Sequence, residues 1–392
     1  MFKYRDEATA RRILERIGNL DVDVRLMHIC GTHQDTIVRF GLEEMLNGVG
    51  VRIAQGPGCP VCVTTSAEIA DAITLARNGV TVTAFGDMMR VPTTIGSLFG
   101  AKAEGADVRI VYSIDDAVQM ARDEPDRPLV FVGVGFETTA PSTCVPLQKD
   151  DCPENFSVYS CHRICPPIIE ALYELGENRI DGFIMPGHVA VITGLDMFYP
   201  VAEKHHAPQV VAGFEPLDVL MAVYMLCRQI KEGRAEVENE YTRLVRPEGN
   251  PVARRLMEET FDPVDRAWRG FPVIRKSALA LKPRFADHDA TKVHEDILAG
   301  TPAVEAEAKG CRCGDVLRGV LSSEECPMFG KACKPMSPLG PCMVSAEGNC
   351  SIAYRLGSRR YRCPTAAQAR RSSPRCASAR GSWLSRTIRR SS

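Results

Sequence analysis

The chain has 392 residues, and its 48 basic and 49 acidic side chains give a formal net charge of −1 at pH 7. Ten arginines and no acid fall after residue 357, so the preceding part is acidic, which argues against nucleic acid as the main partner. No run approaches the roughly 18 uninterrupted apolar residues of a membrane span, and the charged N-terminus lacks the apolar core of a signal peptide. We therefore expect a cytoplasmic protein with neither a nucleic-acid nor a membrane partner.

The first two thirds of the chain alternate short apolar runs with amphipathic stretches, a pattern typical of α/β proteins with parallel sheets. The length exceeds what one hydrophobic core usually organises, so two or three domains are expected. Helices are predicted at 36–46, 66–79, 165–175 and 217–233. Strands are predicted at 25–30, 51–55, 81–86, 107–112, 128–137, 181–187 and 208–216.

We predict two parallel-sheet α/β domains around a cleft, residues 1–120 and 121–285, with a boundary near 115–125. Residues 286–357 are rich in Cys, Gly and Pro and have little periodicity, so they are predicted to form a small irregular iron–sulfur domain stapled by its metal. The Arg-, Ser- and Ala-rich tail at 358–392 is expected to be disordered. A nucleic-acid-binding arm, or translation past a frameshift, is the alternative for this tail.

Six cysteines crowd into forty residues before that tail, and they are Cys311, Cys313, Cys326, Cys333, Cys342 and Cys350. A chain without secretory features keeps its thiols reduced, so the cluster indicates metal binding or redox catalysis rather than disulfides. The two close Cys-x-x-Cys knuckles of a zinc ribbon are missing, and loose spacing in Gly/Pro loops favours an iron–sulfur cluster. The predicted ligands are Cys311 or Cys313, then Cys326, Cys333 and Cys350, with Cys342 the weakest candidate. Structural zinc and ordinary buried cysteines are the alternatives.

Two further thiol motifs follow predicted strands in the first domain. Cys59 and Cys62 form a Cys-x-x-Cys at a strand-to-helix junction, where a reversible disulfide or metal ligation is expected and two buried turn residues are the alternative. Cys30 and His33 place a soft thiolate and an imidazole three residues apart. The thiolate suits low-spin iron, and the imidazole either keeps Cys30 deprotonated, donates to a bound group, or is structural.

Other polar residues also come directly after predicted strands, among them Asp87, Glu137, Thr138, Thr139, His188, Glu215 and Asp218. The carboxyl ends of parallel strands border the ligand crevice of an open α/β sheet, so these side chains are expected to converge on one cleft. Glu137 is predicted to transfer protons or to bind a small polar ligand, and helix capping by its two threonine neighbours is the alternative. The chain has neither a dinucleotide fingerprint nor a phosphate loop.

Eight segments carry these residues in order: CGTHQ (30–34), GPGCPVCV (56–63), FGDMMRVP (85–92), GFETTAP (135–141), PGHV (186–189), GFEPLD (213–218), CRCGDVLRG (311–319) and GPCMVSAEGNC (340–350). Together they resemble the HypD family of nickel–iron hydrogenase maturation factors over roughly residues 5–357. The resemblance implies two α/β domains and a third domain that holds a 4Fe-4S cluster. It also implies a metallocentre assembly scaffold with redox activity rather than a conventional turnover enzyme.

The resemblance further implies residue roles and partners. The iron that carries two cyanides and one carbon monoxide, Fe(CN)2CO, is built with a HypC-like chaperone and a HypE-like cyanide donor. Cys30 binds this iron together with a cysteine of the chaperone, and Cys59 and Cys62 are the redox dithiol between the iron and the cluster. Asp87, Glu137 and His188 are cleft residues. Two alternatives remain open: a cluster-dependent protein-disulfide reductase similar to ferredoxin–thioredoxin reductases, and a zinc-stapled binding module.

Overall fold

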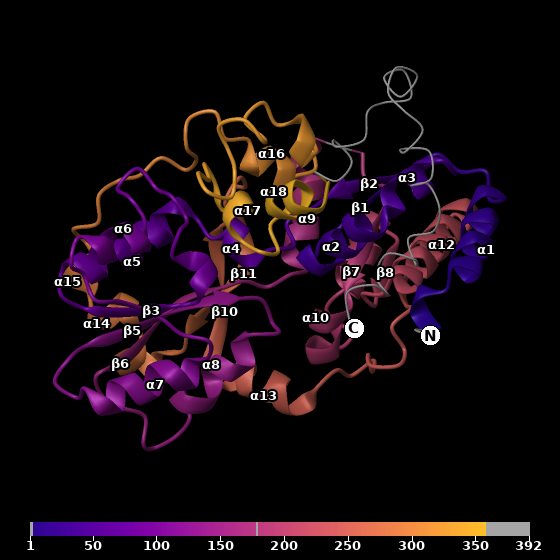
Figure 1. Ribbon diagram of the computed structural model, residues 1–392. Helices are drawn as coiled ribbons and strands as arrows, with labels where there is room; N and C mark the ends of the chain where they lie inside the picture. The colour runs from indigo at the N-terminus through magenta and orange to yellow at the C-terminus, as the bar shows by residue number, and fades with distance from the viewer. Residues whose placement is uncertain (1–2, 178, 358–392) are drawn as a thin grey trace, which may run out of the picture.

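The computed structural model describes residues 3–177 and 179–357, and it has two lobes with a cysteine-rich segment packed against both (Figure 1). Each lobe is built on one parallel β-sheet flanked by helices, which confirms the predicted α/β architecture. Among the described residues, no helix combines the length and apolarity that a bilayer span requires. The tail at 358–392 lies outside the described residues, so the prediction of disorder there is not addressed.

Sheet A, the sheet of the first lobe, contains five parallel strands. Their order is β2 (Val51–Gln55), β1 (Val24–His28), β7 (Gly182–Pro186), β8 (Gln209–Ala212) and β9 (Val237–Asn239). One face is covered by helices α1 (Glu7–Gly18), α2 (Gly31–Phe40), α3 (Leu42–Asn47) and α12 (Pro216–Glu232). The other face packs against α9 (Pro167–Leu175), α10 (Gly187–Thr193) and α11 (Tyr199–His205).

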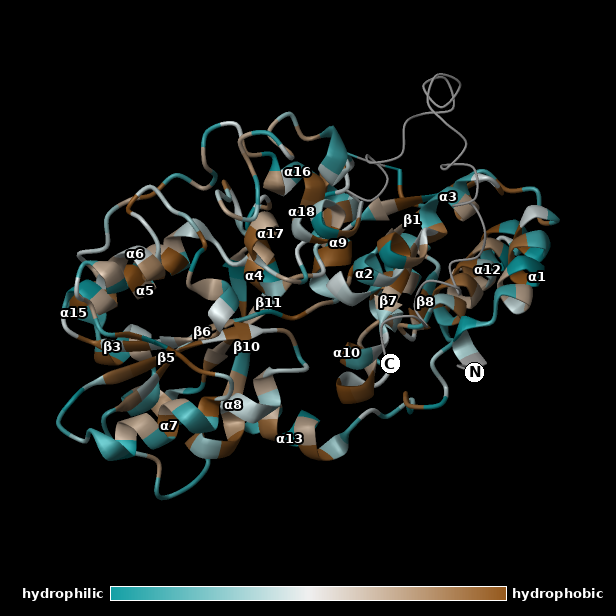
Figure 2. Cartoon of the chain, viewed as in Figure 1, coloured by the Kyte–Doolittle hydropathy of each residue, from teal (hydrophilic) through white to brown (hydrophobic). Residues whose placement is uncertain are grey.

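Sheet B, the sheet of the second lobe, contains four parallel strands. Their order is β4 (Val108–Ile110), β3 (Thr81–Ala84), β5 (Leu129–Gly135) and β6 (Phe156–His162). All seven residues of β5 are buried, as expected for a central strand covered on both faces, and Figure 2 shows hydrophobic residues along β3 and β5. One face is covered by α5 (Ser66–Arg77) and α6 (Leu98–Ala103). The other is covered by α7 (Ile114–Asp123), α8 (Ala140–Leu147), α13 (Pro251–Thr260) and the antiparallel hairpin of β10 (Phe261–Ala267) and β11 (Val273–Leu281).

The strand pairing does not follow the predicted division into residues 1–120 and 121–285. Strands β1 and β2 pair with β7, β8 and β9, whereas β3 and β4 pair with β5 and β6. Sheet B is therefore inserted between the two halves of sheet A, and each sheet takes strands from both sides of the predicted boundary. Hydrophobic periodicity identifies a buried strand, but it carries no information about which strand lies beside it.

The cysteine-rich segment has little regular structure, as predicted for residues 286–357. Its helices are short, and they are η3 (Pro283–His288), α14 (Ala290–Val293), α15 (Glu295–Leu298), α16 (Cys313–Leu317), η4 (Ser323–Glu325), α17 (Pro341–Val344), α18 (Asn349–Ile352) and η5 (Ala353–Gly357). The first part belongs to the lobe of sheet B, because α14 packs on β6 and α15 on α5. The later part contacts α2, and it also contacts the short helix α4 (Pro60–Val63).

A buried ion pair joins α5 to the end of β6. Arg163 has no exposed side-chain area and donates to both carboxylate oxygens of Glu68 at 2.8 and 2.6 Å. Burial raises the pKa of Glu68, but the Arg163 charge and the hydrogen bonds outweigh it and hold that pKa below its ordinary value. The pair therefore fixes a helix to the sheet at a point where neither charge reaches water.

We predict that Arg163→Met lowers the free energy of unfolding by about 3 kcal/mol, because it leaves the Glu68 carboxylate buried without a counter-charge. Urea unfolding followed by circular dichroism measures the loss. Arg234→Met is the matched control, since Arg234 pairs with three glutamates near the surface and such pairs contribute about 1 kcal/mol or less. Equal losses in the two variants would contradict the prediction.

Candidate functional site

Four of the predicted site residues lie at the points where the two sheets reverse their strand order. In sheet A the chain adds β2 on one side of β1 and β7 on the other; in sheet B it adds β4 and β5 on either side of β3. The crevice between the two strands at such a switch point is where open α/β sheets bind ligands. Cys30 and His188 follow β1 and β7, and Asp87 and Glu137 follow β3 and β5.

Cys30 and His188 meet at the switch point of sheet A. The Cys30 Sγ lies 3.7 Å from Nε2 of His188. The other ring nitrogen, Nδ1, accepts a hydrogen bond from the backbone amide of Val189 at 3.0 Å. The neutral ring therefore carries its proton on Nε2, so the N–H is directed at the sulfur.

The Cys30 thiol is almost completely buried, and burial raises its pKa to about 12, although the amides of His33 and Thr32 act in the opposite direction. Burial also lowers the pKa of His188, against the opposing charges of Glu347 and Glu137. Both groups are therefore neutral at pH 7. This combination provides one soft sulfur ligand and one hydrogen-bond donor without a buried net charge.

His33 has the contacts of a structural histidine. Its ring is fully buried, donates from Nε2 to the carbonyl of Gly213 at 3.0 Å and stacks on Phe214 with a centroid distance of 5.0 Å. Burial lowers the pKa of His33 to about 3. The ring thus ties α2 to the end of β8, which matches the structural alternative. Phe214 also contacts the ring of His188 at 5.0 Å, so it separates the two imidazoles.

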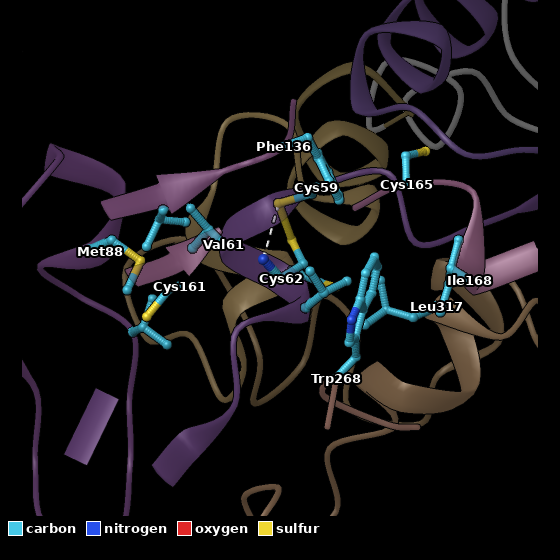
Figure 3. Packing of buried hydrophobic residues seen from close by; sticks show 14 of the residues in the cluster. Cys59, Val61, Cys62, Met88, Phe136, Cys161, Cys165, Ile168, Trp268 and Leu317 are labelled. Atoms are coloured by element: carbon cyan, nitrogen blue, oxygen red, sulfur yellow. Dashed lines mark hydrogen bonds between the residues drawn. A yellow bond between two sulfur atoms is a disulfide. The ribbon is translucent and has the colours of Figure 1, made fainter. Parts of the chain in front are cut away.

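Cys59 and Cys62 form a disulfide across the first turn of α4, with their Cα atoms 5.2 Å apart. Figure 3 shows this disulfide among Phe136, Cys165 and Trp268. Both cysteines are buried, with 3% and 0% of their area exposed. The prediction of a residue pair able to form a disulfide agrees with this geometry.

The turn that carries the disulfide packs directly on Cys30. The amide of Gly31 donates to the carbonyl of Gly58 at 3.2 Å. A Cβ atom on Gly58 would lie 2.2–2.6 Å from the main-chain atoms of Cys30, so no side chain fits there. The close approach of the two backbones requires glycine at position 58.

Six cysteines line one narrow cavity, whose empty space including its opening is about 340 Å³, and they are Cys311, Cys313, Cys326, Cys333, Cys342 and Cys350. The sulfurs of Cys313 and Cys342 lie 2.9 Å apart. Neighbouring thiols hold the pKa of Cys313 well below its ordinary value and raise that of Cys342. Cys342 lines the cavity in the same way as the other five cysteines, although the sequence made it the weakest candidate ligand.

The donor set of this cavity, six cysteine thiols, is compatible with an iron–sulfur cluster. Zinc needs four donors that converge on one point, and in the described part of the chain no three His, Cys, Asp or Glu side chains form a group that could hold one ion. The thiolates of a 4Fe-4S cluster bind different irons, so they stand apart around a cavity. The six cysteines line this cavity together with apolar side chains such as Val316 and Phe329, and they exceed the four thiolates that such a cluster requires.

The cysteine-rich segment rests on both the dithiol turn and Cys30. Asn349 donates from Nδ2 to the carbonyl of Gly56 at 3.1 Å. A Cβ atom on Gly31 would lie 2.5 Å from the carbonyl oxygen of Glu347. The thiol groups of the three parts of the chain therefore lie on segments that touch one another.

Asp87 holds the loop that makes this contact. Its Oδ2 accepts from the Ser345 hydroxyl at 2.8 Å and from the amide of Ala346 at 3.0 Å. The next residue, Glu347, is exposed. Partial desolvation nevertheless raises the pKa of its carboxyl group, with the charge of His188 opposing the shift and the charge of Asp87 adding to it. Sequence reasoning missed Glu347, although it lies inside the segment GPCMVSAEGNC, because no strand precedes it.

Glu137 lies at the switch point of sheet B with one carboxylate oxygen unused. Its Oε1 accepts from the amide of Cys165 at 2.7 Å, and Oε2 has no hydrogen-bond partner among the described residues. Burial raises the pKa of Glu137 to about 7, with the amide of Cys165 and the charge of His188 opposing the shift. Thr139 makes no side-chain capping bond at the start of α8. Cys165 was not predicted, because β6, which ends at His162 just before it, was not predicted as a strand.

The last two residues predicted at strand ends, Glu215 and Asp218, organise the start of α12 instead of the site. They form its capping box, Glu215 pairs with Arg5, and Asp218 pairs with Arg243 at 2.9 Å.

We predict that Glu137→Gln removes a pH dependence from folding stability. The pKa of this carboxyl group rises from 4.5 in the unfolded chain to about 7 in the folded one, so the folded state binds its proton more tightly. The free energy of unfolding of the native chain should therefore fall by up to about 3 kcal/mol, relative to the variant, as the pH rises from 4.5 through 7. Urea unfolding of both proteins at pH 5 and pH 8 measures the difference. Parallel stability curves would show that Glu137 titrates as an ordinary surface acid.

Comparison with known proteins identifies the family. The HypD family model, described as "Hydrogenase formation hypA family", matches residues 7–357. A hydrogenase expression/formation protein of Methanocaldococcus jannaschii is 45% identical over 362 residues, which cover 91% of this chain and 99% of that protein. The hydrogenase maturation factors HypD of Rhodobacter capsulatus and Azotobacter vinelandii are 41% and 42% identical, each over 91% of this chain and over 98% and 97% of their own lengths. The chain therefore belongs to the HypD family of hydrogenase maturation factors.

Proposed function

We propose that the chain is the scaffold on which iron receives two cyanides and one carbon monoxide before it is delivered to a nickel–iron hydrogenase. One observation carries the proposal: the main chain around Cys30 touches both the turn that bears Cys59 and Cys62 and the loop between two cysteines of the six-cysteine cavity. A soft ligand, a dithiol and a cluster site thus lie on neighbouring segments. In this reaction the iron is the cargo and the cluster is the resident cofactor.

Cys30 holds the iron in the proposed reaction. A thiolate is a soft, electron-rich ligand, which suits iron that carries cyanide and carbon monoxide. His188 donates its Nε2–H toward the sulfur across 3.7 Å and fixes the direction of that ligand. The protein supplies one thiolate here, so the proposal includes a second thiolate from a small HypC-like chaperone, while a HypE-like protein brings the cyanide.

Cys59 and Cys62 accept and return electrons in the proposal. Opening their disulfide takes up two electrons and two protons and produces two thiols. Four of the six cysteines of the cavity would hold a 4Fe-4S cluster, which would supply one-electron transfer when bound. Helix α17 at this cavity packs against α4, which carries the disulfide.

The burial of the disulfide argues against the alternative of a protein-disulfide reductase. Such an enzyme must bring a partner's disulfide to one of its own sulfurs for exchange. Cys59 and Cys62 have 3% and 0% of their area exposed, so a partner protein does not reach them in this conformation. An internal electron acceptor such as the neighbouring Cys30 site is compatible with that burial.

We predict that Cys30→Ala abolishes the infrared bands of iron-bound cyanide and carbon monoxide in the protein purified anaerobically with its HypC-like partner. Sulfide content and the visible absorbance of the cluster should stay at the native level, because the six-cysteine cavity is unchanged, whereas iron content should fall by the cargo iron. Surviving bands would remove Cys30 from the role of iron ligand.

Two control variants make that test specific. Cys333→Ala is the reciprocal change, since it removes a thiol of the cavity and should reduce the cluster absorbance. Cys227→Ala removes a buried thiol in the core of sheet A, away from every proposed site, and should change neither signal.

A further inference from the structure

A pocket between the two lobes remains outside the proposed iron chemistry. It encloses about 1060 Å³ including its open mouth. The lobe of sheet A contributes Thr193, Asp196 and Met197, and the lobe of sheet B contributes α13, β10 and β11. In Figure 1, α10 and α13 lie below the middle of the molecule, and α16, α17 and α18 lie above it. The pocket and the six-cysteine cavity share no lining residue.

The inner polar group of this pocket is Glu137. The residue is 98% buried, since 2% of its area is exposed, and it lines the pocket with an Oε2 that lacks a partner among the described residues. The other buried polar residue of the lining, Thr193, has a satisfied hydroxyl, which bonds to the carbonyls of Val189 and Gly194. Glu137 is thus the group with free hydrogen-bonding capacity.

The walls between Glu137 and the mouth are apolar. Ile164, Met197, Met257, Phe261 and Leu279 line them. The sulfur and aromatic side chains among these residues adapt to small apolar bodies. A ligand that fills the pocket therefore needs a hydrophobic body with a single polar end.

The charges at the mouth set the sign of that polar end. Arg254 pairs with Asp196 at 3.6 Å and Lys282 pairs with Asp262 at 3.7 Å, so both cations are compensated. Glu258 also lines the mouth and forms no ion pair among the described residues. The lining carries four acids and two bases, so it attracts cations and repels anions.

We propose that this pocket binds a small organic cation, with an apolar body against Met257, Phe261 and Leu279 and an ammonium or amidinium group on Oε2 of Glu137. A buried carboxylate without a counter-charge is costly, and such a ligand supplies the missing charge and hydrogen bond. The raised pKa of Glu137, with burial as its largest cause, agrees with a carboxyl group that lacks its counter-cation.

Isothermal titration calorimetry of the full chain, purified anaerobically, tests this with three probes of the same size. Benzylamine should bind about tenfold or more tightly than benzyl alcohol, and benzoate should bind more weakly still. Equal affinities for the three probes, or no detectable binding of benzylamine at millimolar concentration, would overturn the proposal.

Three variants locate the binding. Glu137→Gln should weaken benzylamine about tenfold while leaving benzyl alcohol unchanged, and Met257→Trp should weaken both by filling the pocket. Glu259→Gln, on an exposed neighbour that does not line the pocket, should keep the affinity within about twofold. Benzylamine binding that survives both Glu137→Gln and Met257→Trp would place the site elsewhere. Circular dichroism checks the fold of each variant, and Met257→Trp decides the question if Glu137→Gln is unfolded.

Discussion

The close approach of three backbone segments at Cys30 is the contact on which the proposed site depends. Gly58 leaves no room for a Cβ against the Cys30 main chain, and Gly31 leaves none against Glu347. Larger residues at these positions would push apart the turn that bears Cys59 and Cys62, the main chain at Cys30 and the loop that contains Glu347. Backbone hydrogen bonds and the Asn349 amide then hold the segments at this distance. Because main chain rather than side chain makes the contact, the spacing of the sulfurs is rigid.

The insertion of sheet B into sheet A has a consequence for the Cys30–His188 pair. Cys30 precedes the strands of sheet B in the chain, and His188 follows them. The pair therefore forms only when β7 pairs with β1, which lies before the inserted strands in the sequence. The three paired residues of β1 and β7 end at His28 and Ile184, just before the site. Asp87 in sheet B then holds the loop that covers Gly31. Sheet B therefore positions a group that acts at the switch point of sheet A.

The sequence predicted strands β1 to β5, β7 and β8, because these are short apolar runs, but it missed β6, β9, β10 and β11 and several helices such as α1 and α7. It also placed Cys30, Asp87, Glu137 and His188 correctly at strand ends, since polar residues directly after buried strands are informative. It failed on the domain boundary, because the pairing of β1 with β7 depends on packing between distant segments. It left the role of His33 open for a similar reason: its partner, the carbonyl of Gly213, is identified only by the fold. Glu347 was missed because it lies in a loop without a preceding strand, and Cys165 was missed because β6, the strand that precedes it, was not predicted.

Burial leaves the site around Cys30 almost uncharged. The thiol of Cys30 has a pKa near 12, and His33 and His188 are held neutral by burial. An environment of low dielectric constant disfavours isolated charges of either sign. A metal cation that enters the site and the thiolate of Cys30 compensate each other's charge. The site therefore favours a thiolate when the metal is present and a thiol when it is absent. The same physics applies to Glu137 on the other side, where the uncompensated carboxyl group faces an apolar pocket. The two sites thus share one requirement, a cation that the folded chain does not itself provide.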